Sequence, residues 1–190
     1  MPSSSYPISL FLGGARSGKS TQAERVIAEA ARARRTRPLY VATAEARDAE
    51  MQARILTHRE RRGAAWDTIE QPFDLVGTLA GNAGRVILID CLTLWLSNLM
   101  LAGCNVAAER AHLIAELTTL RGPIALISNE VGLGIVPDNA LARAFRDEAG
   151  MLNQAIAAVA HKVVFMAAGL QLVMKDEPMA EPSPSGFAAR

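Results

Sequence analysis

Residues 13–20 of this sequence have the types and spacing of a phosphate-binding loop. They read GGARSGKS and fit the pattern G-x-x-x-x-G-K-[ST] at every fixed position, between an apolar run at 8–12 and a helical pattern. Glycines let the backbone turn its N–H groups toward phosphate oxygens, and the start of a helix adds positive potential. We expect Lys19 to reach the terminal phosphates and Ser20 to offer its hydroxyl to Mg²⁺. The motif therefore predicts binding of a nucleoside triphosphate.

A carboxylate that could hold the metal follows another apolar run. Residues 86–90 read VILID, with an acid at the point where a strand would leave its sheet. We expect that strand to neighbour the first one, so that Asp90 can hold the Mg²⁺ shell opposite Ser20. An aspartate that caps the following helix would give the same pattern. Beside a phosphate loop, the sequence favours the metal role.

Residues 54–62, RILTHRERR, place a histidine among arginines. Nearby positive charge disfavours the imidazolium, so the His58 ring would be largely neutral and nucleophilic, and the same charge would attract phosphate groups. On a helix, Arg54 and Arg62 would lie on the same face as His58. From this segment alone, a solvent-exposed helix with an incidental histidine is the simpler interpretation.

A polar turn with glycines occupies residues 128–138, SNEVGLGIVPD, after another apolar run. In a parallel sheet this turn would lie at the carboxyl edge, where such sheets bind ligands, and Asn129 and Glu130 could orient a nucleotide or substrate. A plain turn whose last polar residues cap the next helix is an equal alternative. On that helix, Arg143 and Arg146 share a face and either meet solvent or reach a phosphate.

Short, continuously apolar runs alternate with helical patterns along the chain. Continuous hydrophobicity is typical of strands covered on both faces, as in a parallel sheet. The expected strands are 8–12, 38–43, 85–90, 123–128 and 162–168. The expected helices are 20–35, 47–62, 92–102, 106–121 and 139–160. This alternation predicts an α/β fold of the phosphate-loop NTPase type, a doubly wound, mostly parallel sheet with helices on both faces.

A single domain accounts for the length of 190 residues. We expect it to span residues 8–175, after a flexible N-terminus at 1–7. The tail, 176–190, is rich in proline, serine and glycine and is expected to be disordered, because it cannot bury enough apolar surface to order itself.

The composition argues against several classes of protein. The formal net charge of +1 gives no general electrostatic case for binding nucleic acid. No signal peptide is expected from the first residues. The longest uncharged run, 91–108, fits a buried helix and its exit loop better than a membrane span. Cys91 and Cys104 are expected to be buried free thiols, as suits a reducing cytoplasm.

Taken together, these motifs make the chain similar to a known enzyme family. The segments GGARSGKS, YVATAEARDAEMQARILTHRERR, VILIDCLT and SNEVGLGIVPDNALARAFRDEAGMLNQ follow one another in that order. In them the sequence resembles the bifunctional adenosylcobinamide kinase / adenosylcobinamide-phosphate guanylyltransferases of cobalamin biosynthesis, over residues 8–175. Many families share the phosphate loop, whereas E-M-x-x-R-I-x-x-H and N-E-V-G-x-G-I-V-P are much narrower patterns.

The resemblance gives His58 a role. In that family the histidine at this position accepts GMP from GTP and forms a covalent guanylyl-histidine. A neutral imidazole nitrogen can attack the α-phosphorus while basic groups and Mg²⁺ stabilise the leaving pyrophosphate. His112 and His161 lack comparable surroundings and are expected to be surface or packing residues.

The resemblance also implies which residues contact the nucleotide. By position they are Gly13, Gly14, Ala15, Arg16, Ser17, Gly18, Lys19, Ser20, Thr43, Ala44, Glu45, Arg59, Glu60, Arg61, Arg62, Glu70 and Asp90, with His58 and Lys19 catalytic and Ser20 and Asp90 on the metal. Ala44 stands where the family often has serine and cannot supply that hydroxyl. Arg59 replaces a common lysine, which keeps the charge but changes the geometry.

The favoured function is a two-step enzyme. It would phosphorylate the aminopropanol hydroxyl of adenosylcobinamide with ATP or GTP, then convert adenosylcobinamide phosphate to adenosylcobinamide-GDP with GTP and Mg²⁺. The family further implies a homotrimer. Two alternatives stay open: a plain phosphate-loop kinase in which His58 orients substrate, and an ATP-driven module of the RecA type. The small size and the lack of a basic stripe disfavour the latter.

Overall fold

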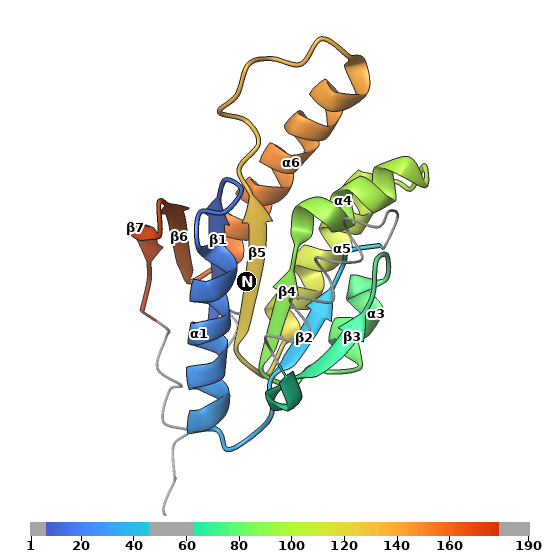
Figure 1. Cartoon of the computed structure of the whole chain (residues 1–190). Helices are drawn as coiled ribbons and strands as arrows, with labels where there is room; N and C mark the ends of the chain where they lie inside the picture. The colour runs from blue at the N-terminus through green and yellow to red at the C-terminus, as the bar shows by residue number, and fades with distance from the viewer. Residues whose placement is uncertain (1–6, 46–62, 179–190) are drawn as a thin grey trace, which may run out of the picture.

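The computed structural model describes residues 7–45 and 63–178. Its centre is a seven-stranded sheet in the order β3-β2-β4-β5-β1-β6-β7 (Figure 1). Every neighbouring pair is parallel except β6 and β7. The strands are β1 (Ile8–Gly13), β2 (Leu39–Ala42), β3 (Asp67–Glu70), β4 (Ile87–Asp90), β5 (Ile124–Asn129), β6 (Lys162–Ala167) and β7 (Leu170–Asp176). The predicted α/β class is confirmed.

Helices pack on both faces of this sheet. The larger core lies under α3 (Leu75–Ala80), α4 (Leu92–Leu101), α5 (Val106–Thr119) and α6 (Ala140–Val159). The smaller core lies under α1 (Lys19–Ala33) on the opposite face. Strand β1 shows why the strands are continuously apolar: Leu10 and Leu12 join the larger core, whereas Phe11 between them joins the smaller one.

Three elements were not predicted from the sequence. Strand β3, DTIE, alternates between half-buried and exposed residues at the edge of the sheet, and β7, LQLVMKD, is almost wholly exposed. Strand β3 therefore lacks the continuous hydrophobicity of the central strands, whereas β7 keeps the apolar run 172–174 in spite of its exposure. Helix α3 has six residues, too few to show a clear helical period. The 3-10 turn η1 (Gly63–Ala65) precedes β3, and the helix expected at 47–62 lies outside the described residues.

Two further expectations need correction. Strand β7 includes Asp176, and the Glu177 amide donates to the His161 carbonyl at 2.8 Å, so the predicted end of the domain at residue 175 falls short. Cys91 is buried as expected, but Cys104 is exposed, because it follows the turn that ends α4. Within the described ranges, no helix is long and apolar enough to cross a membrane.

Candidate nucleotide site

The phosphate loop joins β1 to α1 at the carboxyl edge of the sheet (Figure 1). Gly13 has φ 151°, and a Cβ at that position would lie 2.4 Å from the Met166 carbonyl oxygen. Gly18 is the N-cap of α1 and has φ 96°, in the region that favours glycine. The curvature of the loop therefore depends on residues without side chains, as the motif predicted. Of the other loop residues, Gly14, Ala15 and Arg16 are exposed, Ser17 is buried, and Ser20 is partly buried.

The Lys19 side chain is buried within the phosphate loop. It is 8% exposed, and its Nζ donates to the Gly14 carbonyl oxygen at 2.9 Å. Hydrogen bonds from an ammonium to an anionic oxygen are stronger than those to a neutral carbonyl. A phosphate bound in the loop would therefore be the better acceptor for this Nζ.

Asp90 ends β4, but β4 is not the neighbour of β1. Strand β5 lies between them, with Ile127 opposite Asp90 and Asn129 opposite Gly13. The expectation of adjacent strands was therefore wrong, although both ends stay on the carboxyl edge. Asp90 does not cap α4, because Cys91 occupies the N-cap position.

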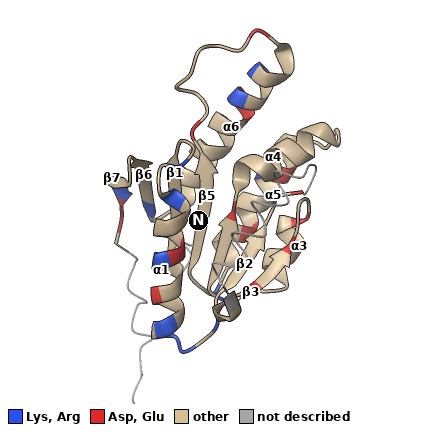
Figure 2. Cartoon of the chain, in the orientation of Figure 1, with Lys and Arg blue, Asp and Glu red and all other residues tan. Residues whose placement is uncertain are grey.

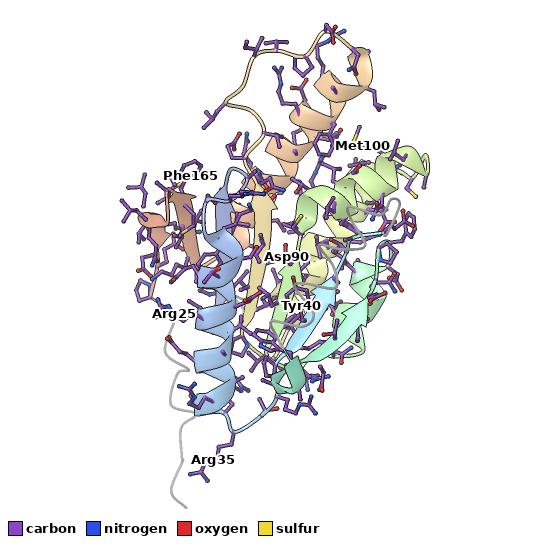
Figure 3. The ribbon with its side chains drawn as sticks, viewed as in Figure 1. Arg25, Arg35, Tyr40, Asp90, Met100 and Phe165 are labelled. Atoms are coloured by element: carbon purple, nitrogen blue, oxygen red, sulfur yellow. The ribbon has the colours of Figure 1, made fainter. Side chains whose placement is uncertain are left out.

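The Tyr40 hydroxyl fixes the Asp90 carboxylate, donating to its Oδ2 at 2.7 Å (Figure 3). Tyr40 is 3% exposed and meets the Trp66 ring edge to face, with centroids 6.1 Å apart. Tyr40 was not predicted as a site residue from the sequence. The available signal was a tyrosine inside the apolar run PLYVAT, because a buried tyrosine hydroxyl normally has a partner.

Between the loop and Asp90 lies a small polar cluster. The side-chain amide of Asn129 donates to the Thr93 hydroxyl at 2.7 Å, and that hydroxyl lies 3.2 Å from the Cys91 sulfur. Burial, and next the nearby Asp90 carboxylate, raise the pKa of the Cys91 thiol to about 11, while Lys19 acts in the opposite sense. The thiol is therefore neutral and a poor nucleophile at physiological pH. Lys19 and Asp90 thus lie on the same carboxyl edge of the sheet, on either side of this cluster.

The nucleotide contacts expected after β2 form a second group. Thr43 is fully buried; its hydroxyl donates to the Cys91 carbonyl at 2.7 Å and accepts from the Cys91 amide at 2.8 Å. Ala44 and Glu45 are partly exposed. Glu70 is exposed at the end of the edge strand β3, opposite Ala42 of β2. The structure thus groups Glu70 with the end of β2, with three strands between it and the phosphate loop.

The polar turn after β5 is hydrogen-bonded to the phosphate loop at its start and to α6 at its end. The Glu130 amide donates to the Gly13 carbonyl at 3.2 Å, which ties the turn to the phosphate loop. Asn139 caps α6 by accepting from the Ala142 amide, and Arg143 donates to the carbonyl oxygens of residues 137 and 138. Arg146 pairs with its neighbour Asp147. Neither arginine is directed at the loop in this structure.

The second catalytic candidate cannot be placed. His58, together with Arg59, Glu60, Arg61 and Arg62, falls in residues 46–62, which lie outside the described residues. The expectations for the other histidines can be examined. His112 is exposed on α5, and the His161 ring nitrogen Nδ1 accepts from the Ile8 amide at 3.2 Å. Both therefore serve as surface or packing residues.

The donor set at the sheet edge fits a magnesium ion bound together with a triphosphate. Mg²⁺ in such sites takes one or two protein oxygens and completes its shell with phosphates and water. Ser20, in the first turn of α1, supplies a hydroxyl, and Asp90 supplies a carboxylate held by Tyr40. Across the described part of the chain no three His, Cys, Asp or Glu side chains are grouped as metal ligands. A cage made only of such side chains is not what a phosphate-bound ion requires.

Comparisons with known proteins show the family of the chain. The family model described as cobinamide kinase / cobinamide phosphate guanyltransferase matches residues 9–174. The bifunctional adenosylcobalamin biosynthesis protein CobP of Pseudomonas aeruginosa is 50% identical over 90% of this chain and 98% of its own length. CobU proteins of the same description are 40% identical in Salmonella typhimurium and 37% identical in Escherichia coli, each over 87% of this chain and 98% of their own.

A solved structure supports the fold independently of these sequences. The flagellar accessory protein FlaH from Methanocaldococcus jannaschii superposes with a TM-score of 0.51, covering 90% of this chain and 79% of that one. The sequence identity is 13%, so the likeness concerns the fold alone. It agrees with the α/β fold expected from the sequence.

Proposed function

Because the chain belongs to the cobinamide kinase / cobinamide phosphate guanyltransferase family, we propose that its phosphate loop and His58 divide the chemistry of two reactions. The chain is a bifunctional enzyme of cobalamin biosynthesis. The phosphate loop holds the triphosphate in both reactions, and His58 carries GMP in the second. The observation that carries the proposal is the buried Lys19 in a phosphate loop at the same sheet edge as the Tyr40-bound carboxylate of Asp90.

In the kinase step, a hydroxyl of cobinamide attacks the terminal phosphorus of ATP or GTP, and the bond to the leaving diphosphate breaks. Lys19 neutralises charge on the transferring group, and the loop amides hold the phosphates in line. Ser20 and Asp90 would hold Mg²⁺, whose chemistry is to neutralise the charge that develops on the phosphate oxygens. Tyr40 keeps the Asp90 carboxylate in one orientation. No protein nucleophile is needed in this step.

In the guanylyl step, the neutral His58 imidazole attacks the α-phosphorus of GTP and pyrophosphate leaves. An oxygen of cobinamide phosphate then attacks the same phosphorus, the phosphorus–nitrogen bond breaks, and the GDP-linked product forms. The support is chemical: the segment 54–62 is rich in arginine, which keeps the ring neutral and attracts the triphosphate. Glu70 and Thr43–Glu45, grouped at the β2–β3 end of the sheet, are the nucleotide contacts nearest in sequence to this segment.

The remaining parts of the proposal concern partners. The substrates are ATP, GTP, adenosylcobinamide and adenosylcobinamide phosphate, with Mg²⁺ as the cofactor. We further propose a homotrimer that works in the cytoplasm, where nucleoside triphosphates are abundant. The family resemblance supports the trimer, and sedimentation of the purified protein tests it.

The sharpest test is transfer of radioactive label from GTP to protein. GTP labelled at the α-phosphate should leave label on the denatured protein, whereas GTP labelled at the γ-phosphate should not. Brief acid should release the label and mild alkali should spare it, because a phosphorus–nitrogen bond to imidazole is acid-labile. His58→Asn should lose both the label and guanylyl transfer while kinase activity survives. The exposed His112 provides the matched control, since His112→Asn should label normally. Unchanged labelling of His58→Asn would overturn the role of His58.

A further inference from the structure

The connection between β5 and α6 projects beyond the rest of the sheet edge (Figure 1). We call residues 131–137 the β5–α6 arm. Their sequence is VGLGIVP, without a charged residue, and Figure 2 shows a long uncharged stretch in the connection between β5 and α6. Its large side chains face outward: Leu133 is 82% exposed, Ile135 97% and Val136 60%. Exposed apolar side chains gathered in one segment usually mark a binding surface.

Hydrogen bonds hold the arm at both ends. At its start, the Glu130 amide donates to the Gly13 carbonyl, and the Glu130 carboxylate accepts from the Gly132 amide at 2.5 Å. At its end, one Arg143 nitrogen donates to the carbonyl oxygens of Pro137 and Asp138 at 3.0 and 2.7 Å. These bonds anchor the exposed apolar residues beside the phosphate loop.

We propose that the β5–α6 arm is the docking surface for the corrin ring of the cobinamide substrate. The inference rests on the kinase and guanyltransferase activities of the family and does not depend on the guanylyl-histidine. A corrin ring is broad, rimmed with methyl groups and amide side chains, and its peripheral groups are uncharged. Such a ligand requires an apolar, uncharged surface outside the phosphate site. Within the described chain, the arm has those properties and directly follows Glu130, whose amide donates to the Gly13 carbonyl of the loop.

The geometry of the substrate suits this position. Its reacting hydroxyl ends a side arm of about seven bonds, which keeps the ring roughly 9 Å from the phosphorus. Five residues of extended chain span at most about 17 Å, so Ile135 lies no farther than that from Glu130, a limit comparable with the side arm and the ring together.

A second copy of the chain is the competing occupant. A groove of about 290 Å³ lies between α4 and α6, lined by Ser97, Met100, Leu101, Asn139, Leu141, Ala142 and Phe145. Figure 3 shows Met100 toward the end of α4. An arm from another copy could fill such a groove. The corrin ring is favoured because the arm is tied to the phosphate loop, whereas the groove lies on the face of the sheet opposite α1.

The test compares two serine variants of the arm with a serine variant elsewhere. Leu133→Ser and Ile135→Ser change exposed side chains, so both proteins should fold, and Leu172→Ser on β7 alters an equally apolar residue that is 64% exposed. Binding of cobinamide is measured by equilibrium dialysis and the visible absorbance of the corrin, binding of a fluorescent GTP analogue by titration, and oligomeric state by sedimentation velocity.

Each arm variant should weaken cobinamide binding about tenfold, the effect of losing most of one buried aliphatic side chain. The double variant should weaken it further, with GTP binding and sedimentation unchanged, and Leu172→Ser should bind cobinamide normally. Normal cobinamide binding by the double variant would overturn the proposal, and so would an altered sedimentation coefficient, which would assign the arm to contacts between copies. Labelling of His58 by GTP requires no cobinamide, so failure of that proposal would be seen separately.

Discussion

The phosphate loop and the β5–α6 arm leave neighbouring strands at the same edge of the sheet but use their residues in opposite ways. In the loop, the backbone turns inward around glycines and Lys19 is buried against a carbonyl. In the arm, hydrogen bonds hold both ends and apolar side chains face outward. Backbone N–H groups suit phosphates, whereas exposed aliphatic side chains suit an uncharged ring. One edge can therefore hold two unlike parts of a reaction.

The largest effect should come from the charge in the loop. Lys19→Ala should reduce both activities about a hundredfold or more, because loss of one cationic contact to developing phosphate charge costs on the order of 3 kcal/mol. Steady-state rates with saturating cobinamide or cobinamide phosphate measure the change. Arg25→Ala is the control, since Arg25 lies on the exposed side of the same helix and pairs with Glu29. Near-normal turnover by Lys19→Ala in either reaction would contradict the assignment of the loop.

Glycine-to-alanine substitutions should affect the loop and the arm differently. Gly13→Ala should lower the free energy of unfolding by about 1–3 kcal/mol and weaken GTP binding, because the added Cβ would collide with the Met166 carbonyl. Gly134→Ala, in the arm, should change stability by no more than about 0.5 kcal/mol, since nothing lies within 4 Å of the new Cβ. Denaturant unfolding and GTP titration measure both. Equal losses in the two variants would remove the distinction between a packed loop and an open arm.

The sequence predicted the loop better than its surroundings, for a physical reason. A phosphate loop depends on local backbone geometry, which a short motif specifies, and the central strands show their burial as continuous hydrophobicity. The insertion of β5 between β1 and β4 depends on long-range pairing that no local pattern records. The Tyr40–Asp90 bond likewise joins residues 50 positions apart. The edge strand β3 was missed because its exposed polar residues interrupt the apolar pattern that identified the others, whereas β7 is apolar at residues 172–174 and follows β6 after a short turn.

A smaller effect should follow from loosening the carboxylate beside the loop. Asp90→Asn should raise the Mg²⁺ concentration needed for half-maximal activity in both reactions, because an amide is a weaker ligand than a carboxylate. Tyr40→Phe should raise this Mg²⁺ concentration by less than Asp90→Asn does. It removes one hydrogen bond to a charged group, worth about 1.5–3 kcal/mol, but keeps the carboxylate itself. Binding of Mn²⁺, followed by electron paramagnetic resonance with GTP present, provides a readout besides activity. Unchanged metal affinity in Asp90→Asn would remove Asp90 from the metal site.

The smallest effect on catalysis should come from Arg143, which is hydrogen-bonded to the end of the arm. Its substitution tests whether the arm is held independently of the loop. Arg143→Ala removes both hydrogen bonds to the carbonyl oxygens of Pro137 and Asp138, so the arm should open more often while the loop stays intact. Cleavage of residues 131–138 by a nonspecific protease should accelerate about tenfold, with GTP affinity within twofold of the original protein. Arg146→Ala is the matched control, because Arg146 pairs with its exposed neighbour Asp147 and makes no bond to the arm in the described part of the chain. If both variants were cleaved alike, the position of the arm would depend on the Glu130–Gly13 bond and the capping of α6 by Asn139, with no contribution from Arg143. If Arg143→Ala also lost GTP affinity, the arm and the loop would form one cooperative unit, and the contrast between them would be one of shape alone.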